Sequence, residues 1–246
     1  MSTLKATTIE PATGTNVTLG TTGDTVALPG NTLALDTWKD SGGNTLFTSN
    51  GSGVVSSVNS GLAGAGPVLI QSQTASGDAS ISFTSGIDST YDKYMFVYVN
   101  IHPATNRAKF LFQVNVSGES GFNESMTTTS FTAYNAESGG TPVLGYRTGA
   151  DQANGTAYQK LSEEISNASK GSTSGEFHLF APSSTTYVKQ FYQRSNDYND
   201  TGGGAIYSNE SFTAGYINVT GAITEVSFKM DSGNIDAGTI KLYGVK

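Results

Sequence analysis

The clearest pattern in the chain is a period-two alternation of apolar and polar residues between residues 67 and 246. The stretch Lys93–His102 (KYMFVYVNIH) is almost continuously apolar, which is typical of a central strand in a sandwich. In Arg107–Val116 the two kinds of side chain alternate, which predicts one face toward a core and one toward solvent. The predicted core face carries Ala108, Phe110, Phe112, Val114 and Val116, and the predicted outer face carries Arg107, Lys109, Gln113 and Asn115.

Further segments have the length and composition of strands and are separated by turn residues. They are Ala79–Thr84, Thr128–Tyr134, Glu176–Ala181, Thr186–Gln193, Phe212–Thr220, Ile223–Met230 and Thr239–Val245. We expect the last two to form a hairpin around Asp231–Asn234 (DSGN), with Gly233 and Asn234 at positive φ. The fold class predicted for residues 67–246 is therefore all-β, an antiparallel β-sandwich of jelly-roll-like kind.

One segment of this region fits two secondary structures. Tyr158, Leu161, Ile165 and Ala168 have the spacing of a helix, and the acidic Ser162–Glu164 would suit its exposed side. The flanking glycines and serines suit a strand equally well, so periodicity leaves the choice open.

Residues 1–60 have a different texture, in which short apolar pairs at alternate positions stand between turn signals such as Pro29-Gly30. Each pair would be a strand too short to bury its own apolar face. One interpretation is a disordered polar tail. We favour a fibrous segment of short extended strands that becomes ordered when copies of the chain intertwine or dock on a partner. The residues predicted to make these contacts are Leu4, Ile9, Val17, Leu19, Val26, Leu28, Leu33 and Leu35.

Composition adds limits to this picture. Residues 61–66 are mostly Gly and Ala and predict a linker. The net charge of −7 argues against nucleic acid as a partner, and no apolar run is long enough for membrane insertion. No cysteine is present, so stability must come from burial or oligomerisation. The first residues lack a signal-peptide pattern, so we expect assembly in a cytoplasm and release by lysis.

The sequence offers little for catalysis or cofactor binding, and we predict neither a catalytic residue, a metal site nor a cofactor. Gly-x-Ser-x-Gly does not occur, and His102 and His178 are the only histidines. Asp197 and Asp200 could converge in a loop as a carboxylate pair for glycan cleavage, but a solvated turn is the favoured interpretation. Their spacing does not match an EF-hand loop, and no zinc-ligand spacing is present.

Two loops are candidates for recognition, because loops on a rigid sandwich commonly carry binding residues. The first is Gly139–Gly155, with Tyr146, Arg147 and Asp151. The second is Ser195–Gly204, with Asp197, Tyr198 and Asp200. An aromatic side chain beside polar groups suits a sugar or a protein contact.

Two stretches in the C-terminal part of the chain, LFAPSSTTY (Leu179–Tyr187) and SGNIDAGTIKLYG (Ser232–Gly244), carry a resemblance. With their spacing, they resemble the C-terminal domain of virion structural proteins from marine tailed bacteriophages, described as tail-fibre or capsid-associated proteins. Leu4–Val26 is similar to N-terminal segments of fibre-like proteins of the same phages. The resemblance implies an extended conformation for the ambiguous segment around Tyr158.

The resemblance and the contrast between the two parts of the chain lead to three functional hypotheses. The first is a non-enzymatic tail component, fibre- or adhesin-like and homotrimeric, that docks through its N-terminus and exposes the sandwich for host attachment. The second is a capsid decoration protein or head fibre, and the third is a glycan-degrading tailspike. The expected partners are further copies of the chain, other virion proteins of tail or capsid, and a glycan or protein of the host surface.

Overall fold

The computed structural model describes residues 37–40, 42–49, 55–58, 66–200 and 205–246. The chain divides into two compact units, Met1–Gly64 and Ala65–Lys246, and each is described by itself. The eight residues predicted to make N-terminal docking or trimer contacts all precede residue 37 and lie outside the described residues.

The first unit contains a three-stranded antiparallel sheet in the order β1-β2-β3. Its strands are β1 (Thr37–Lys39), β2 (Thr45–Ser49) and β3 (Val55–Val58). The carboxylate of Asp40 closes the β1–β2 turn by accepting hydrogen bonds from the backbone N–H groups of Gly42 and Asn44 at 2.9 and 2.8 Å. Trp38 and Phe47 stack with ring centroids 5.5 Å apart, and Trp38 remains exposed.

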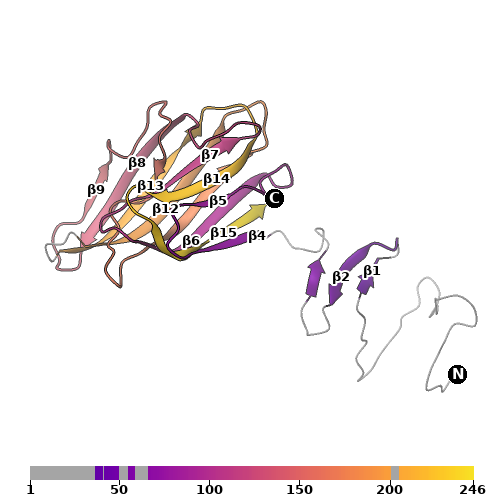
Figure 1. The fold of residues 1–246 in the computed structure, drawn as a ribbon, viewed down its shortest axis with the longest axis horizontal. Helices are drawn as coiled ribbons and strands as arrows, with labels where there is room; N and C mark the ends of the chain where they lie inside the picture. The colour runs from indigo at the N-terminus through magenta and orange to yellow at the C-terminus, as the bar shows by residue number, and fades with distance from the viewer. Residues whose placement is uncertain (1–36, 41, 50–54, 59–65, 201–204) are drawn as a thin grey trace, which may run out of the picture. The chain divides into compact units, whose positions relative to one another are not determined.

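The second unit is a sandwich of an eight-stranded and a four-stranded antiparallel sheet, drawn in Figure 1. The larger sheet has the order β4-β15-β6-β11-β12-β13-β8-β9 and the smaller β10-β7-β14-β5. The strands are β4 (Val68–Ala75), β5 (Ile81–Phe83), β6 (Lys93–Pro103), β7 (Phe110–Val116), β8 (Met126–Ala136), β9 (Val143–Tyr146), β10 (Gln159–Lys160), β11 (Thr173–Phe180), β12 (Lys189–Asp200), β13 (Ile206–Ile217), β14 (Ile223–Met230) and β15 (Ile235–Val245). The prediction of an all-β antiparallel sandwich is confirmed.

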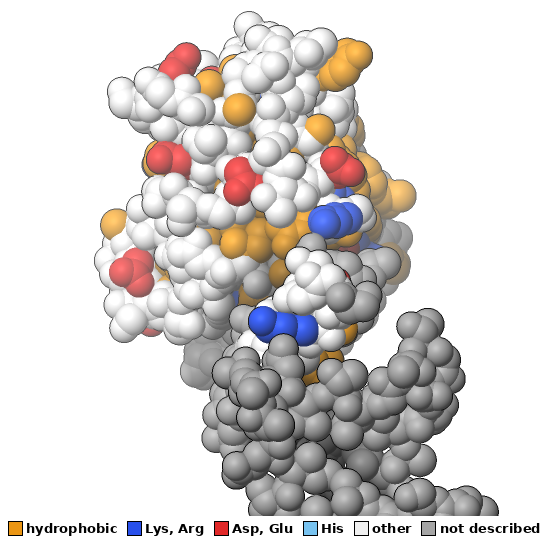
Figure 2. All heavy atoms as spheres, turned by 90° about the vertical axis from the view of Figure 1, so that its right-hand side faces the viewer, with side chains coloured by type: hydrophobic (Ala, Val, Ile, Leu, Met, Phe, Trp, Pro, Cys, Tyr) orange, Lys and Arg blue, Asp and Glu red, His pale blue; other side chains and the backbone are white. Residues whose placement is uncertain are grey.

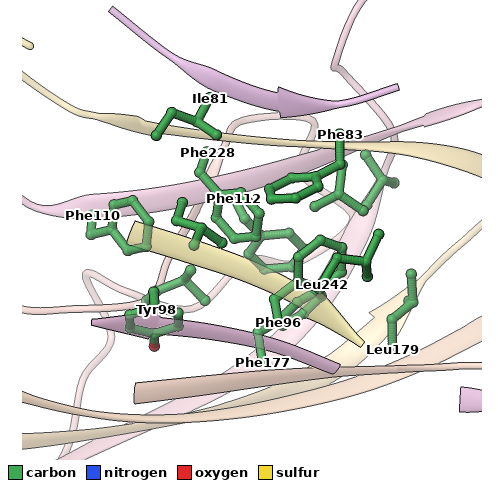
Figure 3. Close-up of a cluster of buried hydrophobic side chains, with 14 of the residues drawn as sticks. Ile81, Phe83, Phe96, Tyr98, Phe110, Phe112, Phe177, Leu179, Phe228 and Leu242 are labelled. Carbon is green, nitrogen blue, oxygen red and sulfur yellow. The ribbon is translucent and has the colours of Figure 1, made fainter. Parts of the chain in front are cut away.

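The core lies between the two sheets and is dominated by aromatic rings (Figure 3). Phe110 and Phe228, from the smaller sheet, stack with centroids 5.6 Å apart. Phe228 also meets Phe96 of the larger sheet at 5.3 Å, and Phe112 meets Phe177 at 4.4 Å. Such offset and edge contacts add to the burial of the rings, so this cluster holds the two layers together.

The predicted hairpin between Ile223–Met230 and Thr239–Val245 is wrong. Strand β14 pairs with β5 and β7 in the smaller sheet, whereas β15 pairs with β4 and β6 in the larger one. The connection therefore crosses from one layer to the other. Gly233 has the predicted positive φ of 71°, but Asn234 does not, and its side-chain amide instead donates a 2.8 Å hydrogen bond to the Gly77 carbonyl.

The predicted solvent face of β7 is also largely buried. Gln113 and Asn115 have almost no exposed surface, because the backbone of residues 119–124 and 156–157 lies against them. The Gln113 amide donates hydrogen bonds to the carbonyl oxygens of Glu124 at 3.0 Å and of Thr156 and Ala157 at 3.2 Å. Polar side chains can thus occupy a buried face when the covering backbone supplies partners.

The ambiguous segment around Tyr158 forms a two-residue strand, β10, rather than a helix. After it the chain runs irregularly, and the side chains of Leu161 and Ile165 are fully buried in the core.

Strands β4 and β9 were not among the predicted strands, and both lie at edges of the larger sheet. Within the described residues no helix has the length and apolar character needed to cross a bilayer.

Charged side chains are sparse on the surface. On the face drawn in Figure 2 a few acidic and basic side chains are seen among uncharged side chains and backbone, and hydrophobic side chains gather near its middle, in keeping with a charged fraction of 13%. Steering of a ligand by a strong field of one sign is therefore not a feature of this face.

Candidate functional site

The half of the larger sheet formed by β12, β13 and β8 has an unusual inner face, because it is polar. Buried hydroxyl and amide side chains line it: Ser130, Thr132, Gln193, Ser195, Ser211 and Thr213. The segment between β9 and β11 covers them and satisfies several of them from its backbone. The Ser195 hydroxyl donates to the Leu161 carbonyl at 2.7 Å, and the Thr213 hydroxyl to the Lys160 carbonyl at 3.5 Å.

A cleft of about 310 Å³ opens where this covering segment meets the ends of β12, β13 and β8. Two tyrosines, two asparagines and three charged residues line it: Tyr134, Arg147, Glu163, Glu164, Asn199, Tyr207 and Asn209. Strand pairing brings four of them together, because Tyr134 pairs with Asn209 and Asn199 pairs with Tyr207. Alternation then points these four side chains to one face of the sheet.

The aromatic wall of the cleft is formed by the two tyrosines. The rings of Tyr134 and Tyr207 meet edge to face, with centroids 5.8 Å apart and planes at 82°. The guanidinium of Arg147 lies over the Tyr134 ring at 5.6 Å. Its Nε donates a 2.6 Å hydrogen bond to the Thr132 hydroxyl, which fixes the side chain against the sheet.

The acidic side chains at the cleft are both in ion pairs. Glu163 lies 3.6 Å from Arg147, and Glu164 lies 2.5 Å from Arg107 and 3.9 Å from Lys109. These side chains are partly exposed, so the pairs position the carboxylates more than they stabilise the fold.

The cleft also contains two acceptor atoms without a partner. The side-chain oxygens Oδ1 of Asn199 and Asn209 are buried and make no hydrogen bond within the protein. Asn209 is only 2% exposed. An unsatisfied buried acceptor costs about 1–3 kcal/mol, so two at one site call for a ligand or ordered solvent that donates to them.

Asp197 lies beneath this site and is fully buried. Its carboxylate accepts hydrogen bonds from the Thr173 hydroxyl at 2.5 Å and from the Glu163 backbone N–H at 2.9 Å. Burial raises the pKa of Asp197 to about 7 even though both donors act to lower it. The side chain therefore links the sheet to the segment that carries Glu163.

The structure brings only some of the predicted recognition residues to the cleft. Arg147 lines it and Asp197 supports it, whereas the hydroxyl of Tyr146 donates to the carboxylate of Asp151 at 2.7 Å in an exposed pair. The expected loop placement of Asp197, Tyr198 and Asp200 is wrong, because all three belong to β12. Gly139–Gly155 is likewise interrupted by β9, which ends at Tyr146.

The sequence had not identified Tyr134, Tyr207, Asn199 and Asn209 as site residues. A signal was present, since Tyr207 and Asn209 are two residues apart, as are Asp197 and Asn199. Residues spaced by two lie on one face of a strand. What the sequence does not show is that β8, β12 and β13 are neighbours, and that alone places these faces together.

The residues considered for catalysis occupy separate places in the sandwich. Asp197 and Asp200 are three positions apart on one strand and so point to opposite faces, which contradicts their convergence as a pair. His178 stacks on Tyr192 at 4.5 Å, and burial lowers its pKa. His102 bonds the Gly171 carbonyl through Nδ1. No group of three or more His, Cys, Asp or Glu side chains that could hold a metal ion occurs in the described part of the chain.

Comparison with known proteins gives no relative for this chain: no family model, no curated protein and no solved structure matches it.

Proposed function

We propose that this chain is a non-enzymatic structural protein of a bacteriophage virion, an adhesin-like fibre component that presents its sandwich to the host surface. The observation that carries the proposal is the cleft framed by Tyr134, Tyr207 and Arg147, with two buried amide oxygens that have no hydrogen-bond partner within the protein. Aromatic walls combined with a few convergent polar groups are characteristic of recognition sites. The resemblance of Leu4–Val26, Leu179–Tyr187 and Ser232–Gly244 to phage virion proteins supplies the biological setting.

The cleft supports recognition better than glycan cleavage. Glycan cleavage needs two carboxyl groups that both reach the substrate. Here Glu163 and Glu164 are engaged with arginines, and Asp197 has no exposed surface. A tailspike activity would appear as new reducing ends when purified chain is incubated with host surface polysaccharide.

Attachment through shallow clefts gains strength from several copies, and we expect the full chain to be a homotrimer. The small sheet of β1–β3 supports self-association, because three short strands bury little apolar surface alone and leave Trp38 exposed. Sedimentation equilibrium of the full chain should give three times the 25.6 kDa chain mass. A monodisperse monomer would contradict the trimer and remove the avidity on which the proposal draws.

The attachment role itself is tested by competition. Purified full chain, added in excess, should reduce adsorption of the phage that carries it to its host cells, measured by counting free phage. The Tyr207→Ala variant should compete at least tenfold more weakly, because it removes one wall of the cleft. Tyr187→Ala is the matched control, since Tyr187 is 72% exposed and does not line the cleft.

Two results would overturn attachment. One is adsorption that is unaffected by wild-type chain at any concentration. The other is gold-labelled antibody against the chain found only on the capsid in electron micrographs of the phage. The second result would favour the capsid decoration or head-fibre role.

A further inference from the structure

We infer that the cleft binds a neutral saccharide whose hydroxyl groups donate hydrogen bonds to Asn209 and Asn199 while its ring packs against Tyr134 and Tyr207. This inference rests on the proposed recognition function and adds the chemical class of the ligand. It is argued from three features of the cleft: its empty acceptors, its aromatic wall and its charge.

The empty acceptors specify a ligand that donates hydrogen bonds. Asn209 Oδ1 lies at a side chain that is 98% buried, and Asn199 Oδ1 is buried on the neighbouring strand. Asn209 and Asn199 are diagonal neighbours across β13 and β12, because Asn209 pairs with Asp197 and Asn199 with Tyr207. Both residues line the cleft, and a rotation of each side-chain amide toward it would present both oxygens to hydroxyls of one bound sugar ring.

The aromatic wall specifies a ligand with an apolar face. Tyr134 and Tyr207 are each partly exposed, and their edge-to-face contact leaves ring surface turned to the cleft. A sugar ring combines an apolar C–H face with hydroxyls at its rim, which matches rings beside amide oxygens. The volume of about 310 Å³ is at the lower end for ligand pockets and suits a terminal sugar unit.

The charges disfavour the two charged alternatives. The cleft is lined by one arginine and two glutamates, a sum of 1 − 2 = −1, and Arg107 and Lys109 beside it pair with Glu164. An anionic sugar or phosphate would therefore meet carboxylates without an unpaired cation to receive it. A cationic amine would meet Arg147, which already occupies the face of the Tyr134 ring.

The test is direct binding of small sugars to the purified full chain. The probes are glucose, galactose, mannose and N-acetylglucosamine, with glucuronic acid and N-acetylneuraminic acid as anionic probes and spermidine as the cationic one. Saturation-transfer NMR and calorimetry should detect at least one neutral sugar with a Kd in the millimolar range. The anionic probes and spermidine should bind at least tenfold more weakly.

Two variants and one control locate the site. Tyr207→Ala and Asn209→Leu should each weaken binding of the neutral sugar at least tenfold, whereas Tyr187→Ala should leave it unchanged. Thermal melting of each variant checks that it is folded. If Asn209→Leu is unfolded, the site is tested with Tyr207→Ala only. Binding that survives both cleft variants would place the sugar elsewhere and overturn the inference.

The remaining outcomes separate this inference from the proposed function. If the chain competes with phage adsorption and Tyr207→Ala does not, but no neutral sugar binds, attachment stands and the saccharide assignment is wrong. Preferred binding of spermidine or of an anionic probe would also overturn it. If a neutral sugar binds in the cleft but the chain never competes with adsorption, the saccharide site stands and the attachment role fails.

Discussion

Removing Thr239–Lys246 should abolish folding of the sandwich, and no soluble protein with a cooperative thermal transition should be recovered. The deleted residues form most of β15, which lies between β4 and β6 inside the larger sheet. Their loss removes Ile240 and Leu242, both fully buried, and separates β4 from β15, its one neighbour among the described strands. Replacing either residue with Ala alone would cost about 2–5 kcal/mol, so their joint loss with the hydrogen-bonded ladder is comparable to a typical net stability of about 5–15 kcal/mol.

The control for this truncation is removal of Lys246 alone. Lys246 follows the end of β15 and is exposed, so its loss should leave solubility and melting temperature unchanged. The comparison is made by soluble yield and by circular dichroism melting of the two truncated chains. A chain ending at Gly238 that stays soluble and melts cooperatively would show that β15 does not hold the sheet together.

The place of β15 illustrates what the sequence alone could supply. Alternation correctly identified the strand and its apolar face, because burial on one side imposes a period of two. It also suggested a hairpin with β14, because neighbouring strands joined by a short turn usually pair. The structure resolves the connection differently: Asp231–Asn234, with Gly233 at a φ of 71°, carries the chain into the other sheet, where Ile235 already pairs with Pro103 of β6.

The candidate site was harder to predict for a related reason. Ser195–Asp200 is rich in Asn, Asp and Ser, residues that favour turns over strands. The segment is nevertheless a strand, since β13 pairs with β12 along its whole length and β11 pairs with it as far as Asp197. Pairing with neighbouring strands outweighed the local preference for turns. The segment expected to be a solvated loop is therefore part of a buried polar face. Arg147 was correctly predicted to lie in a loop, because it follows the end of β9 in a connection between strands.

The second large effect expected concerns pH and the Asp197 carboxyl. Burial raises the pKa of Asp197 from 3.8 to about 7 in the folded protein. The folded state therefore holds this proton more tightly than the unfolded state. The contribution of Asp197 to the free energy of unfolding is fully present below about pH 4. It falls by about 1.4 kcal/mol for each pH unit as the pH rises toward 7, a loss of about 4 kcal/mol in all.

Asp197→Asn should remove this dependence and raise the melting temperature above pH 7. An amide fits the site, because its oxygen can accept from the Glu163 backbone N–H while its NH₂ group donates to the Thr173 hydroxyl. That hydroxyl is also 3.3 Å from the Asn196 carbonyl, to which it can turn its proton. The measurement is the difference in melting temperature between variant and wild type from pH 5 to pH 8, in which the titration of His178 and Glu124 cancels.

Asp236→Asn makes the same chemical change at an exposed position of β15 and should leave the pH profile as in wild type. Parallel profiles for wild type and Asp197→Asn would mean that Asp197 stays ionised throughout, held by its two donors. The outcome matters for the cleft, because the Asp197 carboxyl binds the backbone of Glu163 from below. A proton lost there places a buried charge beneath Asn209 and Glu163, so ligand binding in the cleft should change over the same pH range as stability.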